Sequence, residues 1–377
     1  MITYQKLETD QQLADLCEHL ATCEAVALDT EFMRVNTYYP QIGLLQVFAD
    51  GQTYLLDPLA IDCWQPFKAL LQAHRPQKVL HACSEDLEVF QYWLGVRPQA
   101  LVDTQVAAAF AGLGYTLGYQ NLLLQLLGLH IDKDETRSNW LQRPLSQAQY
   151  RYAALDVRDL LTCHRQLQQR LQDQGRWDWF QSDMQRLSEP VNRLEPQQAY
   201  RQVKAAWRIT GQSLGVLQAL AAWRECKARQ WDRPRGFLLS DSAMLALAEA
   251  RPNHFCQLTQ HKQLSTVSVR RYGQSWLQAI AKGKLQTPVS LPKPLSKAEY
   301  NQFKRLQHCA RHVAKQVRLE PQLLFRKRDL LALFEGLRQQ QPITMPSAWS
   351  GWRWQLLQAP ITQIYNQLRQ EHTACAT

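Results

Sequence analysis

The sequence changes its periodicity near residue 105, and this change restricts the possible folds more than any other feature. Before it, apolar runs have the length of strands and are bounded by turn residues: 24–32, 42–48, 53–57, 77–82 and 100–105. Helical segments lie only between the later runs. After residue 105, apolar residues recur almost wholly at helical spacing. The pattern predicts an α/β domain, with a mixed sheet flanked by helices, and then a helical region.

The helical region divides further. One long helix is predicted from Ser146 to about Leu171, because Ser146 is a suitable N-cap and one apolar stripe continues through the segment. Residues 286–297, "QTPVSLPKPLSK", contain three prolines and no periodicity, which predicts a linker. The segments "DRPRGFLLSDSAMLALAEA" and "EPQLLFRKRDLLALFEG", on its two sides, resemble each other. They indicate two degenerate copies of one small helical domain.

The net charge of +10 is unevenly distributed. Residues 1–200 hold 16 Lys and Arg against 24 Asp and Glu, a net charge of −8. The remaining residues hold 27 basic (43 minus 16) and 9 acidic (33 minus 24) side chains, a net charge of +18. A basic domain of this kind is typical of proteins that bind polyanions, nucleic acid above all. The alternative, a well-solvated surface, does not explain why only one half is basic.

Composition also indicates a compartment. The nine Cys include no C-x-x-C pair and are scattered along the chain, which disfavours a disulfide framework. The first residues contain no apolar signal segment, and no 18 apolar residues run together. We therefore expect a cytoplasmic protein with reduced thiols and no membrane association.

Acidic residues stand where a buried strand should be apolar. In "AVALDTEFMRV", residues 25–35, Asp29 and Glu31 lie two apart on the predicted strand, so their side chains point to the same side. Two carboxylates held there are costly unless a cation or a shared proton neutralises them. Asp86 is a third candidate, because it lies in the first turn of a predicted helix directly after a buried strand, where sheets hold ligands.

A phenol and a fourth carboxylate come from the long predicted helix. Tyr152 and Asp156 are four residues apart, so they share a helical face. Four carboxylates without His or Cys form an all-oxygen site, which Mg²⁺ or Mn²⁺ prefers and Zn²⁺ does not. Two such ions support in-line displacement at phosphorus, and the phenol would orient or deprotonate the attacking water. Each signal alone has a commoner explanation, such as helix-dipole stabilisation for Asp86, so their joint order carries the prediction.

That order, "DTE", "SEDLEVF" and "YAALDV", resembles the DEDD exonuclease superfamily in its Tyr-containing subgroup. The segments "YYPQIGLLQV", "HACSEDLEVF", "LVDTQVAAAF" and "TRSNWLQRPLSQAQYRYAALDV" are similar to the ribonuclease D family. "LAAWRECKARQWDRPRGFLLSD" resembles the HRDC domain, and the last 80 residues resemble a second, divergent copy. The resemblance implies a ribonuclease-H-like exonuclease domain at 1–195 and two small all-α HRDC domains at 205–288 and 296–377.

The resemblance also implies an activity. A 3′-5′ exoribonuclease of this family trims tRNA precursors and other small structured RNAs, releases nucleoside 5′-monophosphates and needs no obligate protein partner. Its two divalent ions, Mg²⁺ or Mn²⁺, are held by Asp29, Glu31, Asp86 and Asp156, with Asp29 bridging both, and Tyr152 holds the attacking water. RNA contacts are predicted in the basic half, where a solvated helix face has the same composition: Arg224, Lys227, Arg229, Arg233 and Arg235.

Three alternatives stay open at this point. A 3′-5′ exonuclease that prefers DNA uses the same carboxylates. A non-catalytic RNA-binding protein keeps the fold, although all five site positions are filled here. A helicase accessory module is suggested by the HRDC copies alone, but the chain contains no G-x-x-x-x-G-K-[ST] phosphate loop.

Overall fold

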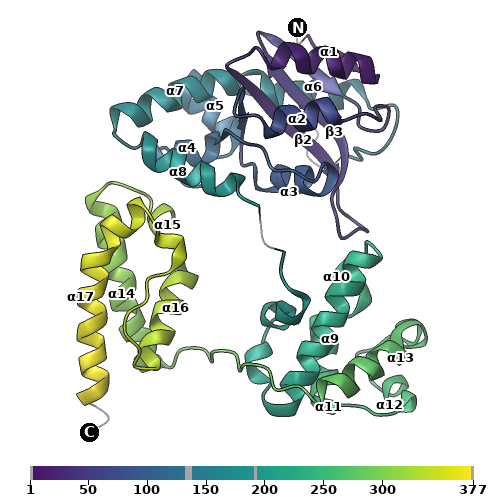
Figure 1. Ribbon diagram of the computed structural model, residues 1–377, viewed down its shortest axis with the longest axis vertical. Helices are drawn as coiled ribbons and strands as arrows, with labels where there is room; N and C mark the ends of the chain where they lie inside the picture. The colour runs from purple at the N-terminus through teal and green to yellow at the C-terminus, as the bar shows by residue number, and fades with distance from the viewer. Residues whose placement is uncertain (1–2, 132–137, 191–192, 375–377) are drawn as a thin grey trace. The chain divides into compact units, whose positions relative to one another are not determined.

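The computed structural model describes residues 3–131, 138–190 and 193–374 (Figure 1). They form two compact units. Of the described residues, the first unit contains 3–33, 42–131, 138–190 and 295–374, and the second contains 34–41 and 193–294. Among the described residues, no helix combines the length and apolar character that a bilayer span requires.

The first unit is built on a six-stranded sheet with the strand order β1-β4-β3-β2-β5-β6. Its strands are β1 (Gln5–Leu7), β2 (Ala25–Met33), β3 (Gln41–Ala49), β4 (Gln52–Leu56), β5 (Gln77–Leu80) and β6 (Leu101–Asp103). β3 and β4 pair antiparallel, whereas β1 with β4, β2 with β5, and β5 with β6 pair parallel. The predicted mixed sheet is thus confirmed. β1 was not predicted, because only Leu7 of its three residues is buried, too little for a strand pattern.

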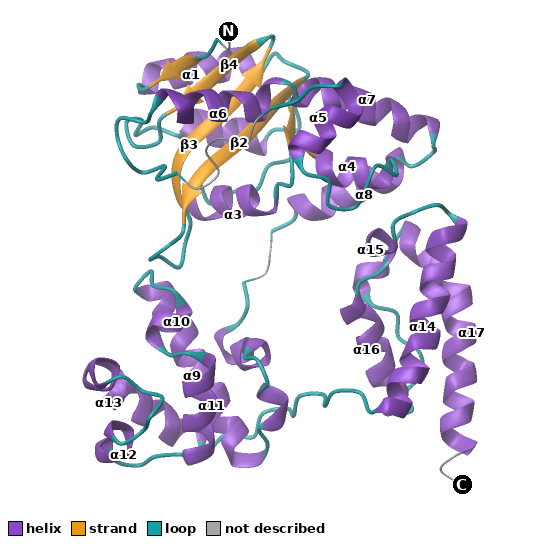
Figure 2. Cartoon of the chain, turned by 180° about the vertical axis from the view of Figure 1, so that it is seen from behind, coloured by secondary structure: helices purple, strands orange, loops and turns teal. Residues whose placement is uncertain are grey.

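Helices cover both faces of the sheet (Figures 1 and 2). Before residue 190, the first unit contains α1 (Asp10–Leu20), α2 (Gln65–Gln72), α3 (Ser84–Trp93), α4 (Thr104–Phe110), α5 (Tyr119–Leu127), α6 (Gln147–Arg158), α7 (Leu160–Asp173) and α8 (Trp177–Ser188). One core joins α1, α2 and α3 to one side of the sheet. On the other side, Ala153 and Ala154 of α6 are fully buried against Leu44 and Leu55, and their small side chains let the helix approach the strands closely.

The prediction of one helix from Ser146 to Leu171 is wrong. The chain turns at Asp159, which ends α6 and begins α7 with φ −101° and ψ 0°, and Arg158 pairs with its carboxylate at 2.6 Å. α6 packs on β2 and β4, whereas α7 packs on β2, β5 and α4. Because the two helices cover different parts of the core, the continuous apolar stripe bends between them.

The last helices belong to the first unit. They are α14 (Lys297–Gln316), α15 (Pro321–Leu324), α16 (Lys327–Arg338), a 3-10 turn η3 (Ser347–Trp349) and α17 (Trp352–Ala374). Arg353 donates to both carboxylate oxygens of Asp183 on α8, each at 2.5 Å. The Trp352 ring stacks on Trp179 and meets Phe110 edge-on. The last helices share one apolar core with α4, α7 and α8.

The second unit is helical. Its elements are the 3-10 turns η1 (Pro196–Gln202) and η2 (Ala206–Arg208), then α9 (Gly211–Gln230), α10 (Arg235–Leu238), α11 (Asp241–Ala250), α12 (Phe255–Thr259) and α13 (Thr266–Gly283). A long helix, a four-residue helix and a further helix follow one another in α9–α11 and again in α14–α16. The two segments share this order of helices, and the predicted duplication stays a prediction. Residues 286–296 contain no helix or strand, as expected of the linker.

Candidate active site

Three of the predicted acidic side chains meet where β2 passes beneath α6. Asp29 and Glu31 lie on β2 and Asp156 lies near the end of α6. A carboxylate oxygen from each lies within 4.8 Å of the others. The local reason for the position of α6 is its capping box, in which Ser146 and Gln149 each accept a hydrogen bond from the other's backbone N–H. Residues more than 120 positions apart thus form one all-oxygen cluster.

Asp86 lies beside the same strand, through a partner that the sequence pattern did not indicate. Its Oδ1 accepts hydrogen bonds from the Thr30 backbone N–H at 3.1 Å and from the Thr30 hydroxyl at 2.5 Å. Thr30 stands between the two acidic residues of β2, and both Thr30 and Asp86 are buried. The helix carrying Asp86 is therefore fixed to the strand carrying the other acids.

The electrostatics of the cluster fit cation binding. Burial raises the pKa of all four carboxyl groups, and at Asp29 the charges of Asp86, Asp156 and Glu31 add to this effect. Hydrogen bonds from Thr30 partly offset this effect at Asp86, and one from Tyr152 does so at Asp156. Without a cation, the ionised cluster is disfavoured, so these residues could hold hard divalent ions.

Tyr152 lies one turn before Asp156 on α6 and hydrogen-bonds to it. Burial, then the charges of Asp156 and Glu31, raise the pKa of its phenol. The Trp140 ring packs 6.2 Å from the Tyr152 ring, centroid to centroid. All five predicted residues of the candidate site are therefore gathered on β2, α3 and α6.

Asp103 is a supporting residue that the sequence analysis missed. It accepts hydrogen bonds from the backbone N–H groups of Ala82, Cys83 and Gln105 at 2.8–3.0 Å. Ala82 has a φ of +57°, in the left-handed region that non-glycine residues rarely adopt. Asp103 therefore holds the turn that leads into α3 and Asp86. The available signal was an Asp inside the predicted strand 100–105, because Asp is a preferred N-cap and can mark the point where a strand ends and a helix begins.

The sequence analysis also missed the contacts that hold the Trp140 segment, whose ring packs against Tyr152. Arg143 donates two hydrogen bonds to Asp57, both at 2.6 Å, and a third to the Gly43 carbonyl. A Cβ on Gly43 would stand only 2.5 Å from the Trp140 carbonyl oxygen, so β3 and the Trp140 segment touch directly. Glycine at position 43 is what allows this approach.

We expect Gly43→Ala to push the Trp140 segment away from the sheet and loosen the packing of Tyr152. Overpacking of this kind costs about 1–3 kcal/mol of unfolding free energy, and kcat should fall more than RNA affinity. Thermal unfolding and single-turnover assays measure the two effects. Gly236→Ala is the matched control, because a Cβ there meets nothing within 4 Å. Equal behaviour of the two variants would contradict the packing argument.

The raised pKa values predict a pH-dependent response to Mg²⁺. Protonation stabilises the metal-free native state, and this contribution is lost as pH rises through the folded pKa values, from about 6 for Asp86 to about 9 for Glu31. Mg²⁺ binds the ionised carboxylates, so the Tm difference between Mg²⁺ and EDTA should widen from pH 5 to pH 9. Differential scanning fluorimetry at fixed ionic strength measures it. A pH-independent difference would count against this cluster as the metal site.

The predicted RNA contacts occupy unequal environments. Arg224 is 7% exposed and donates to the Leu239 carbonyl and to Asp241, so its guanidinium is not available to a phosphate. This placement argues against Arg224 as an RNA contact. Lys227 and Arg233 are more accessible, and Arg233 is exposed.

Arg229 and Arg235 both pair with the buried carboxylate of Glu225. Burial alone would raise the pKa of Glu225, but hydrogen bonds from Arg235, Tyr38 and Arg229 outweigh it and lower the pKa to about 2. Tyr38 comes from the segment 34–41 that follows β2, and its ring lies under the Arg235 guanidinium. These two arginines therefore have a structural partner already, which weakens their prediction as RNA contacts.

Comparison with known proteins identifies the family of the chain. A family model described as a 3′-5′ exonuclease matches residues 4–172, and one described as an HRDC domain matches residues 213–280. A ribonuclease D of Pseudomonas paraeruginosa is 38% identical over 353 residues, which cover 93% of this chain and 94% of that protein. The chain belongs to the ribonuclease D family. Ribonuclease D of Escherichia coli K12 is 34% identical over 378 residues, 98% of this chain and 100% of the relative.

The solved structures agree. The crystal structure of Escherichia coli RNase D matches with a TM-score of 0.85 at 34% identity, over 98% of this chain and 99% of that one. As a member of the ribonuclease D family, the chain is a 3′-5′ exoribonuclease, and this family of exonucleases uses divalent metal ions. The HRDC model matches the second unit; that residues 296–377 are a divergent second copy stays a prediction.

Proposed function

We propose that the chain shortens the 3′ ends of tRNA precursors and other small structured RNAs, one nucleotide at a time, and releases nucleoside 5′-monophosphates. The observation that supports this most is the convergence of Asp29, Glu31 and Asp156 beside Tyr152 in an exonuclease fold. The crystallised Escherichia coli relative is described as an exoribonuclease involved in structured RNA processing.

We assign two divalent ions, Mg²⁺ or Mn²⁺, to Asp29, Glu31, Asp86 and Asp156. Bound there, such ions neutralise phosphate charge and acidify the attacking water. The chain's own contribution is to hold the four carboxylates in place before substrate arrives. Thr30 fixes Asp86 by two hydrogen bonds, and the Ser146 capping box sets the start of the helix that carries Asp156.

Tyr152 is assigned to hold the attacking water. In the hydrolysis, the water oxygen forms a bond to phosphorus and loses a proton to solvent, the bond from phosphorus to the 3′ oxygen of the shortened RNA breaks, and that oxygen takes up a proton from solvent. Burial is the largest cause of the raised pKa of the phenol, so Tyr152 keeps its proton at neutral pH. A protonated phenol orients a water by hydrogen bonding and does not remove its proton.

The second unit is assigned to hold the body of the RNA. Beside Lys227 and Arg233, Trp231 is 40% exposed and Phe237 is 60% exposed. Basic side chains interleaved with exposed aromatic rings suit phosphate contacts and base stacking. Lys227 contacts two neutral groups, the Trp231 ring and the Gln230 side-chain carbonyl, which a phosphate can replace.

We expect the double variant Lys227→Gln/Arg233→Gln to weaken RNA binding and to make the negative slope of log K against log salt shallower by about 1.4, since each single-strand phosphate contact contributes about 0.7. Fluorescence anisotropy across a salt series measures it. Lys262→Gln/Arg270→Gln, which removes two exposed charges from the same unit, is the control. If both double variants change the slope equally, RNA binding depends only on the net charge of the unit, and the assignment of Lys227 and Arg233 is wrong. Deletion of residues 201–377 is not a suitable test of RNA binding by the basic half. It would remove the last helices, which share an apolar core with the exonuclease part.

Product analysis tests the proposal as a whole. A tRNA precursor with a 3′ extension and a matched DNA strand, both 5′-labelled, are incubated with the protein and either Mg²⁺ or excess EDTA. We expect a Mg²⁺-dependent ladder that shortens from the 3′ end on RNA alone, and 5′-monophosphates from an internally labelled substrate. An equal ladder on DNA would contradict RNA specificity, and an unstructured RNA trimmed faster than the precursor would contradict the substrate class.

A further inference from the structure

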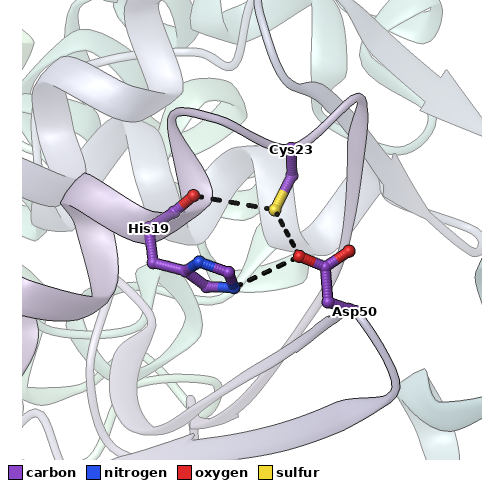
Figure 3. Close-up of side chains that lie close together, drawn as sticks. All are labelled: His19, Cys23 and Asp50. Carbon is purple, nitrogen blue, oxygen red and sulfur yellow. Dashed lines mark hydrogen bonds and ion pairs between the residues drawn. The ribbon is translucent and has the colours of Figure 1, made fainter.

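A second group of side chains of the types that ligate metals lies outside the active-site cluster (Figure 3). His19 is in the last turn of α1, Cys23 follows four residues later, and Asp50 is in the turn between β3 and β4. One ligand atom from each lies within 4.8 Å of the others. Among the described residues, this is the one group of three or more metal-ligating side chains that contains a cysteine.

We propose that His19, Cys23 and Asp50 bind one transition-metal ion of the Zn²⁺ class, through nitrogen, sulfur and oxygen. The chemistry differs from that of the active site. Thiolate and imidazole ligands favour Zn²⁺ and its neighbours over Mg²⁺, which prefers oxygen. The proposal does not depend on the function assigned to the active site.

The backbone around all three residues is well defined. Asp50 and Gly51 have φ values of +46° and +80°, and the flanking Ala49 and Gln52 are paired across the hairpin, which is the pattern of a two-residue type I′ turn. Cys23 is anchored by its backbone N–H to the Leu20 carbonyl, and its side chain is 9% exposed. The thiol is thus held under the hairpin tip that carries Asp50.

The separations suit a tetrahedral ion. The Asp50 Oδ2 lies 3.3 Å from His19 Nε2 and 3.3 Å from Cys23 Sγ. A Zn²⁺ with bonds of about 2.0 Å to nitrogen and oxygen and about 2.3 Å to sulfur sets these edges at about 3.3 and 3.5 Å. The His19 and Asp50 side chains are 45% and 65% exposed, which leaves an open side for a water as fourth ligand.

Binding exchanges a proton for the ion. Without a metal, the thiol of Cys23 donates to Asp50, and burial followed by the Asp50 carboxylate raises its pKa to about 11. On binding, the S–H bond breaks, a sulfur–metal bond forms and the proton passes to solvent, with no change in oxidation state. The same two distances from Asp50 also describe a hydrogen-bonded trio that binds nothing, so the test must detect a sulfur–metal bond.

Co²⁺ provides that test, because a thiolate ligand gives an intense near-ultraviolet charge-transfer band that an all-oxygen site cannot give. The full-length protein, reduced and metal-free, is titrated with Co²⁺ in excess Mg²⁺. We expect a band that saturates at one equivalent, disappears in Cys23→Ser, weakens at least tenfold in apparent affinity in His19→Gln, and is displaced by Zn²⁺. Cys63→Ser, at an exposed cysteine in the same unit, should leave the band unchanged.

The variants separate this site from the active site. His19 and Asp50 are accessible, so His19→Gln and Asp50→Asn test the site even if Cys23→Ser does not fold. Their Mg²⁺-dependent nuclease activity should equal that of the parent protein. Absence of the band in the parent protein would overturn the proposal, and so would a band whose affinity in His19→Gln and Asp50→Asn is unchanged from that of the parent.

Discussion

Asp29→Asn should abolish RNA hydrolysis while the fold becomes more stable in the absence of metal. Asp29 is surrounded by Asp86, Asp156 and Glu31, whose charges raise its pKa after the larger effect of burial. The amide keeps the size of the side chain and removes one charge from this group. We expect single-turnover rates to fall by at least about 10³-fold, of the order seen when a key electrostatic group is lost.

Two measurements on the same sample make this prediction specific. The Tm in EDTA at pH 8 should rise relative to the parent protein, and the increase in Tm on adding Mg²⁺ should shrink. Asp62→Asn removes an exposed carboxylate of the same unit and should change neither value. Retained turnover in Asp29→Asn, or a lower Tm in EDTA, would show that the cluster is not an electrostatically strained metal site.

Tyr152→Phe should slow hydrolysis by about 10²-fold or more, within the range of positioned proton-transfer and water-orienting groups, with little change in RNA affinity. The ring would remain packed against Trp140, so only the hydroxyl and its bond to Asp156 are lost. Single-turnover rates and equilibrium binding with Ca²⁺ in place of Mg²⁺ measure the two quantities separately.

Tyr150 offers a matched control on the same helix. Its ring stacks on Tyr4 at 5.9 Å, below the Lys6 ammonium, on a different face of α6. Tyr150→Phe should leave the rate within a factor of two or three of the parent. If Tyr152→Phe lowers rate and affinity equally, its hydroxyl acts in binding and the assigned role with water is wrong.

The candidate site was predictable from the sequence because its signals are short-range. The alternation of β2 puts Asp29 and Glu31 on one side, and the spacing of four puts Tyr152 and Asp156 on one helical face. What spacing could not show is how α3 meets β2. The hydrogen bonds from Thr30 to Asp86 join residues 56 positions apart. In the sequence, Thr30 is only the residue between two acidic ones, and no pattern predicts its contact with Asp86.

The basic half shows where composition misleads. Arg224 and Arg233 look alike in a charged stretch, yet one is buried against Asp241 and the other is exposed. Similarly, a continuous apolar stripe predicted one helix where the chain has two. Burial and helix direction depend on which surface each residue meets, and neighbouring residues in the sequence do not contain that information.

The sequence by itself determined the mixed sheet followed by helices, the order of the acidic residues, the capped start of α6 and the uneven charge, because each follows from local periodicity and side-chain chemistry. Only the tertiary structure decided that Asp103 holds the turn before Asp86, that Arg353 joins the last helices to α8, and that Asp50 reaches His19 and Cys23. These contacts join distant positions, and their geometry exists only once the whole core has packed.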